Sequence, residues 1–171
     1  MKLLEVHIDE LYRNKSWDYR YILFNNTKNN NEFDILSISS IKIPKALNIP
    51  EKLSYVRNTL ITIIGQYNIS YAAMRIIEGA AMSNINSNSL FRVNIEGVVQ
   101  EVFAGSTIRA YDLACNSSVS AILGTSSKKI LDIFSELNLN GKYMTDRECV
   151  LNDGHKEALV VAIAMLKKEG E

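Results

Sequence analysis

Four acidic residues that are far apart in the sequence stand where apolar strands end or where a helix begins. Asp9 follows the apolar-rich segment 3–8, Glu78 follows segment 74–77, and Asp153 and Glu157 precede or open the apolar stretch 158–166. A folded α/β chain can bring all four to one site. Carboxylates that converge without cysteine ligands suit a hard divalent cation such as Mg²⁺, which prefers oxygen ligands in octahedral geometry. His155 is a further candidate, either as a metal ligand or to orient water.

Each of these residues also has an ordinary structural interpretation. Asp9 can cap a turn, and His155 can be an exposed residue at a helix start. Asp153 and Glu157 are stabilising at the positive end of a helix dipole. Glu78 can pair with a structural arginine, but a carboxylate that closes a buried strand is costly without a cation or a hydrogen-bond partner. A metal role is therefore favoured for Glu78.

The elements that must position these residues follow from the apolar pattern. Strands rich in β-branched and aromatic residues, separated by polar turns such as the asparagine-rich segment 25–31, predict an antiparallel meander in the first half. Apolar residues at helical spacing then alternate with short strands. The predicted strands are 3–8, 17–24, 33–43, 71–77 and 107–113, and the predicted helices are 52–67, 87–103, 116–124, 127–137 and 154–168. This order predicts an α/β fold with a mixed five-stranded sheet flanked by helices, in one domain over residues 1–171.

Composition narrows the classes of function. With 47% hydrophobic residues in 171, the chain can bury a substantial core, and its 19 basic and 19 acidic residues leave no net charge. No global positive field attracts nucleic acid, so a DNA surface would be local. Cys115 and Cys149 have no CxxC spacing, and we interpret them as ordinary residues of a reducing compartment rather than as a disulfide framework. Without a signal peptide or an apolar run of about 20 residues, we expect a cytoplasmic protein, of the cell or of an infected host, with no membrane partner.

Four segments resemble the RuvC-like Holliday junction resolvases of the RNase H-like superfamily. In its short length the chain is most similar to the viral, phage or mobile-element members of that family. Segment 8–17 is similar to the family's first strand ending in Asp and the turn that follows it. Segment 76–79, Ile-Ile-Glu-Gly, resembles the second carboxylate strand. Segment 116–129 resembles the region with two basic positions, and segment 153–162 resembles the final helix. Order and spacing agree over nearly the whole chain.

The sequence also departs from the family pattern in three of these four segments. Lys15 and Ser16 replace the usual Thr-Gly of the first turn, and Ser120 replaces the first basic residue, which leaves Lys128 at the second. In the final helix Gly154 stands where the family has an acidic residue or histidine three residues before the last acid, here Glu157. Either Asp153 or His155 can take that role.

The resemblance implies an Mg²⁺-dependent endonuclease, with Mn²⁺ as an alternative ion, that resolves branched DNA by paired cleavage as a homodimer. Asp9, Glu78, Asp153 and Glu157 would hold the metal, and Lys128 would neutralise a phosphate. Arg13, Arg75, Lys156 and Lys129 are candidates for DNA backbone contacts. Two alternatives remain: a non-catalytic descendant that serves as a DNA-binding or protein-interaction module, favoured by the altered motifs, and an unrelated α/β interaction protein, favoured if Asp9 and Glu78 prove distant.

Overall fold

The computed structural model describes residues 2–11, 16–26, 33–76, 87–126, 129–137 and 152–170. Five strands form one mixed sheet in the order β3-β2-β1-β4-β5. The antiparallel meander predicted from the sequence joins the first three strands, and β1, β4 and β5 run parallel. The strands are β1 Lys2–Leu11, β2 Ser16–Asn26, β3 Phe33–Lys42, β4 Tyr71–Arg75 and β5 Ala110–Ala114. The predicted α/β fold with a mixed five-stranded sheet is confirmed.

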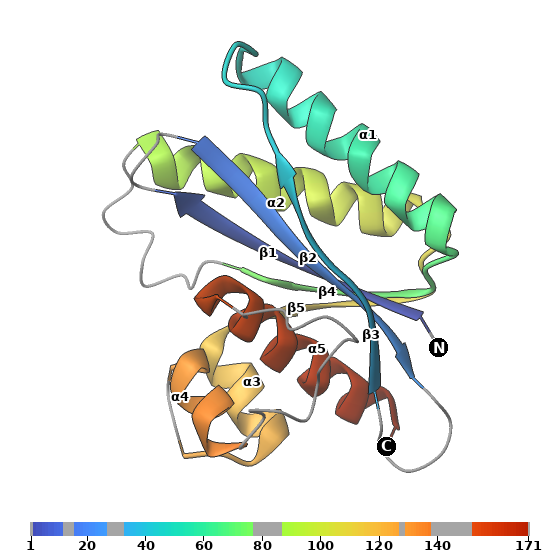
Figure 1. Cartoon of the computed structure of the whole chain (residues 1–171), viewed down its shortest axis with the longest axis vertical. Coiled ribbons are helices and arrows are strands. Elements are labelled where there is room, and N and C mark those ends of the chain that lie inside the picture. The colour runs from blue at the N-terminus through green and yellow to red at the C-terminus, as the bar shows by residue number, and fades with distance from the viewer. Residues whose placement is uncertain are drawn as a thin grey trace.

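Helices cover both faces of this sheet, as Figure 1 shows. Helices α1 and α2 lie together on one face, and α3, α4 and α5 lie on the other. Two apolar cores fill the two interfaces, one built around Leu4, Val6 and α1–α2 and the other around Leu3, Ile22 and α5. The helices are α1 Ile49–Tyr67, α2 Ser87–Gly105, α3 Asn116–Leu123, α4 Ile130–Glu136 and α5 Asp153–Gly170. Within the described parts of the chain, none of these helices is both long and apolar enough to cross a membrane.

The helix starts and stops follow local chemistry. Pro50 lies in the first turn of α1, as predicted, and Asn48 caps this helix: its side chain accepts a hydrogen bond from the Glu51 N–H at 3.0 Å, while the Glu51 carboxylate accepts one from the Asn48 N–H at 2.8 Å. The predicted fifth strand began at residue 107, whereas β5 begins at Ala110. The reason is a turn after α2, in which the Ser106 hydroxyl accepts a hydrogen bond from the Ile108 N–H at 3.4 Å.

Two glycines at similarly open positions should respond oppositely to alanine. Gly124 ends α3 in the left-handed region at φ 68°, while Gly97 lies inside α2, and a Cβ at either position would meet no atom within 4 Å. We expect Gly124→Ala to lower the free energy of unfolding by about 1–2 kcal/mol because of its backbone conformation. Gly97→Ala should raise it by about 0.5–1 kcal/mol through better helix propensity. Urea denaturation measures both, and shifts of the same sign would contradict the assignment.

Candidate active site

The three parallel strands β1, β4 and β5 end at one edge of the sheet. Their carboxyl ends point the same way, and the N-terminal end of α5 lies at that same edge (Figure 1). Arg75, the last residue of β4, forms an ion pair with Glu157 of α5 across 82 residues of sequence. The structure thus brings the final helix to the end of β4, as the sequence analysis required. The predicted ligand Glu78 lies outside the described residues, as does Lys128.

Asp9 lies inside β1 rather than closing it, because the strand continues to Leu11. Pairing of β1 with β4 ends at Val6 and Met74, so Asp9 stands three residues beyond the last described pair, toward the carboxyl edge. Strand residues alternate between faces. Position 9 therefore belongs to the same face as position 3, and Leu3 packs in the core that α5 covers. By backbone register, position 9 of β1 is thus on the face of the sheet that α5 covers.

A second acidic residue, Asp18, was missed by the sequence analysis. It stands directly opposite Asp9 in the β1–β2 pairing, and Lys42 of β3 stands opposite Asp18 on its other side. Residues directly opposite each other in an antiparallel pair share a face, and like charges there are unfavourable without a nearby cation. The signal that could have found Asp18 is the hairpin register, which sets Leu11 against Ser16. That register depends on the conformation of the turn and not on residue type alone.

The two acids of α5 that the sequence singled out, Asp153 and Glu157, have different surroundings. The Asp153 side chain is 72% exposed and accepts a hydrogen bond from Lys156 Nζ at 3.1 Å. Glu157 is only 18% exposed and contacts Arg75. Of this pair, Glu157 is the residue turned toward the sheet edge.

The start of α5 also fixes the place of His155. The Asn152 side chain caps the helix by accepting a hydrogen bond from the His155 N–H at 3.1 Å, and the His155 side chain is partly buried. His155 and Asp153 thus both lie in the first turn, and the choice between them as a metal ligand stays a prediction. No group of three His, Cys, Asp or Glu side chains suited to a metal ion occurs among the residues that the structure describes.

Two of the candidates for DNA backbone contacts have internal partners. Arg75 pairs with Glu157, and Lys156 pairs with Asp153 and lies 6.0 Å from the centre of the Phe134 ring. Ser120, which replaces a basic residue of the family, donates a hydrogen bond from its hydroxyl to the Thr125 carbonyl at 2.9 Å, just beyond the end of α3. Its described role is to hold that helix end. Arg13 lies outside the described residues.

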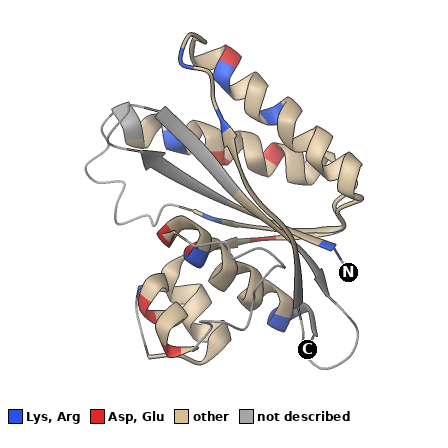
Figure 2. Cartoon of the chain, viewed as in Figure 1, with Lys and Arg blue, Asp and Glu red and all other residues tan. Residues whose placement is uncertain are grey.

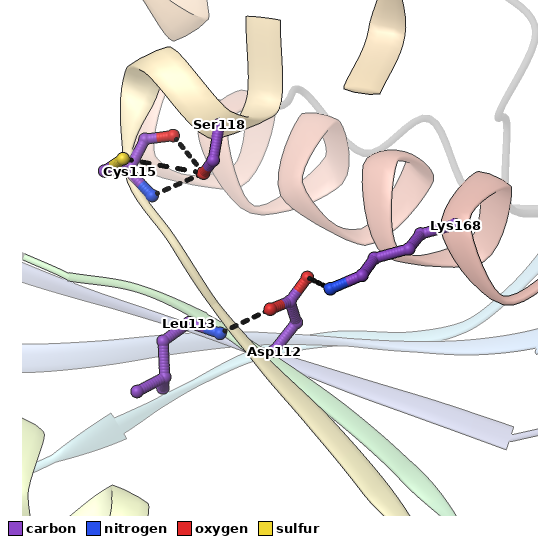
Figure 3. Close-up of polar contacts among 5 residues, drawn as sticks. All are labelled: Asp112, Leu113, Cys115, Ser118 and Lys168. Atoms are coloured by element: carbon purple, nitrogen blue, oxygen red, sulfur yellow. Dashed lines mark hydrogen bonds and ion pairs between the residues drawn. The ribbon is translucent and has the colours of Figure 1, made fainter. Parts of the chain in front are cut away.

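Helix α5 is held at its far end by a second ion pair. Lys168 Nζ lies 2.9 Å from the Asp112 carboxylate of β5 (Figure 3), and the other oxygen of that carboxylate accepts a hydrogen bond from the Leu113 N–H at 3.1 Å. Between the two ends, the helix buries residues 158–162 and 164–166. The charged residues of the described chain in Figure 2 are otherwise distributed over both layers without one dominant sign. Charge and packing together fix α5, and with it Glu157, against the sheet.

Cys115 follows β5 and caps the N-terminus of α3 (Figure 3). Its Sγ is 3.1 Å from the Ser117 hydroxyl, and the thiol donates a hydrogen bond to the Ser118 hydroxyl oxygen at 3.5 Å. These hydrogen bonds, from Ser117 first and then Ser118, lower the pKa of the Cys115 thiol below its ordinary value, because they favour the thiolate. The thiol should therefore react at lower pH than an ordinary cysteine.

We expect Ser117→Ala to move the alkylation of Cys115 to higher pH, since it removes the largest cause of the lowered pKa. The rate of reaction with iodoacetamide, followed against pH in a Cys149→Ala background, gives the midpoint. Ser135→Ala is the matched control, because the Ser135 hydroxyl bonds to the Leu131 carbonyl on α4 instead. An unchanged midpoint in Ser117→Ala would contradict the assigned cause.

Comparison with known proteins identifies solved structures that share this fold. Neither a protein-family model nor a curated protein sequence matches the chain. Among solved structures, RuvC of Thermus thermophilus matches with a TM-score of 0.66 at 10% identity, covering 99% of this chain and 96% of that one. Yeast mitochondrial Holliday junction resolvase Ydc2 matches with a TM-score of 0.63 at 14% identity, covering 98% and 78%. Fowlpox virus resolvase, solved with Holliday junction DNA, matches with a TM-score of 0.53 at 13% identity, covering 97% and 99%. The chain therefore has the RNase H-like fold of RuvC and other Holliday junction resolvases over nearly its full length.

Proposed function

We propose that this protein is a metal-dependent, structure-selective endonuclease that resolves branched DNA, such as Holliday junctions, by paired phosphodiester cleavage. The observation that carries the proposal is the place of Glu157. It lies against the end of β4, on the face of the sheet that also contains position 9 of β1. Three resolvase structures share this fold over most of the chain, and two of them are described with Holliday junction DNA.

Glu78 fits the same site by connectivity. It is two residues beyond Ile76, whose N–H still bonds to the Ala114 carbonyl at 3.0 Å at the carboxyl edge. Glu78 itself lies outside the described residues, and we assign it to this site because it follows Ile76 by two residues in the sequence. On the same ground we assign Lys128, which precedes Lys129, the N-cap residue of α4.

The donor set fits a hard divalent cation. Asp9, Glu78 and Glu157 would supply carboxylate oxygens, which Mg²⁺ and Mn²⁺ prefer. Asp153 or His155 would complete the set. When bound, divalent ions lower the pKa of a water molecule and stabilise charge on the attacked phosphate and the leaving oxygen.

The residues of the chain have the remaining tasks. The carboxylates would hold the ions at the edge of the sheet, and α5, fixed at both ends, keeps Glu157 in place. Lys128 would neutralise a phosphate next to the cleaved bond. A bond forms from the water oxygen to phosphorus while the bond from phosphorus to the 3′ oxygen breaks. Cutting both strands of a symmetric junction needs two sites, which a two-fold homodimer provides.

One observation favours a second candidate, a non-catalytic descendant that binds DNA or a protein. Each acid of α5 with a described side chain contacts a cation of this same chain, Asp153 through Lys156 and Glu157 through Arg75. Internal cations at both positions are compatible with a site that no longer holds metal. The two candidates differ in one property, metal-dependent cutting.

Cleavage of a labelled four-way junction beside linear duplex tests the proposal. We expect symmetric nicks in the junction with Mg²⁺ or Mn²⁺, none with chelator, and none from the Asp9→Asn variant, because the amide removes one ligand charge. Asp132→Asn is the control, since Asp132 is an exposed residue of α4 on a different element. Junction binding without cutting by the wild type would favour the non-catalytic candidate. Absence of both binding and cutting would contradict the endonuclease and a DNA-binding descendant, and would leave only the fold.

A further inference from the structure

The ion pair between Arg75 and Glu157 lies within the proposed site and helps to keep Glu157 in place, but the charge of Arg75 has no role in the cleavage proposed above. It joins the last residue of β4 to the second turn of α5, and the two side chains are 23% and 18% exposed. Arg75 precedes the candidate ligand Glu78 by only three residues. A cation of the protein itself therefore occupies the position next to a proposed metal ligand.

Packing alone is a poor explanation for this pair. Helix α5 already buries a long apolar face against the sheet and is held by Lys168 and Asp112 at its other end. A mostly buried ion pair contributes little net stability, because removing both charges from water offsets much of their attraction. In addition, the Arg75 Nε is buried and has no hydrogen-bond partner among the described atoms. Two apolar residues would hold the helix as well, so the charges point to another role.

We propose that Arg75 is the resident counter-ion of Glu157 and that a divalent cation must displace it from this carboxylate in order to bind. This inference rests on the proposed function, because it takes Glu157 to be a metal ligand. In the metal-free protein the guanidinium neutralises Glu157 and keeps it at the sheet edge. When a metal ion approaches, the two cations repel each other and compete for the same oxygens. Arg75 is thus a positioning residue that lowers metal affinity and raises the metal concentration at which the site fills.

Binding of Mn²⁺ without DNA tests this competition. The electron paramagnetic resonance signal of free Mn²⁺ gives the dissociation constant directly. We expect Arg75→Gln to bind Mn²⁺ about tenfold more tightly than the wild type, because it removes a like charge within a few ångströms of the ion. Arg75→Lys keeps the charge and should stay close to the wild type. A control is Arg57→Gln, which breaks the exposed Arg57–Glu101 pair between α1 and α2 on the other face of the sheet.

A double-mutant cycle separates competition from a purely structural role. In a Glu157→Gln background there is no carboxylate to compete for, so Arg75→Gln should no longer raise the affinity. A structural role predicts the opposite sign, a lower melting temperature with Mn²⁺ binding weakened or unchanged. That result in Arg75→Gln, or an increase that persists in the Glu157→Gln background, would overturn the inference.

The failure of this inference differs from the failure of the proposed function. If Arg75→Gln does not tighten Mn²⁺ binding while the wild type still cuts the four-way junction, the inference falls and the function stands. If the wild type cuts no junction at any metal concentration, the proposed endonuclease falls whatever the Mn²⁺ affinities.

Discussion

Glu78→Gln is expected to abolish junction cleavage while junction binding remains. The substitution keeps the size and the hydrogen-bonding oxygen of the side chain but removes the charge that would hold a divalent ion. We expect a loss of at least about 100-fold in the single-turnover cleavage rate, since even partners of metal ligands typically contribute 10–100-fold. Binding should persist because contacts to the DNA backbone come from other residues. Cleavage of a labelled four-way junction and a gel-shift titration of the same junction measure the two properties.

Glu101→Gln is the matched control for Glu78→Gln. Glu101 lies on α2, its side chain is 57% exposed, and it pairs with Arg57. Its substitution should leave both cleavage and binding unchanged. Circular dichroism spectra verify that both variants are folded. A Glu78→Gln protein that cuts at the original rate would remove Glu78 from the site and with it the proposed ligand set.

Phe103→Ala should produce the largest loss of stability. Phe103 is fully buried near the end of α2, in the core between α1, α2 and the sheet, and its ring centre lies 5.8 Å from that of Tyr111 on β5. Truncation removes apolar contacts and leaves a cavity, which costs about 3–5 kcal/mol for a buried phenylalanine. Because domains are typically stable by only about 5–15 kcal/mol, we expect a large fall in the urea midpoint.

Leu90→Ala on the same helix calibrates that result. Leu90 is 53% exposed, so its truncation should change the free energy of unfolding by no more than about 0.5 kcal/mol. Urea denaturation followed by circular dichroism gives both values. Equal, small changes in the two variants would mean that the end of α2 does not pack as described.

The elements were predictable because their signals are local. The apolar residues of α1 recur at helical spacing, Pro50 marks its first turn, and the three leading strands are separated by polar turns. The resulting meander and the alternation that follows determine the mixed sheet, which the structure confirms. A predicted strand boundary was wrong where a side chain takes a backbone hydrogen bond, as the Ser106 hydroxyl does from the Ile108 N–H in the turn before β5.

The site was only partly predictable because its geometry depends on pairs of residues that are distant in sequence. The acids of α5 were identified from their place at a helix start, but that pattern could not show that Glu157 faces the sheet while Asp153 faces solvent. That difference arises from Arg75, 82 residues away. Asp18 was missed for a related reason, since only the pairing of β1 with β2 sets it beside Asp9. The roles of Asp9, Glu78 and Lys128 stay predictions.

The late position of α5 in the chain has a consequence for synthesis on the ribosome. Chains emerge from their N-termini at about 5–20 residues per second, and domains tend to fold as units. The strands of the sheet are complete at Ala114, but the helix that covers Leu3, Ile22 and Ala73 begins only at Asp153. For several seconds the nascent protein therefore has an apolar sheet face that its last helix has not yet covered. Nascent-chain aggregation and chaperone capture should concentrate in that interval, and any nuclease activity would arise only after it, when Glu157 reaches the edge of the sheet.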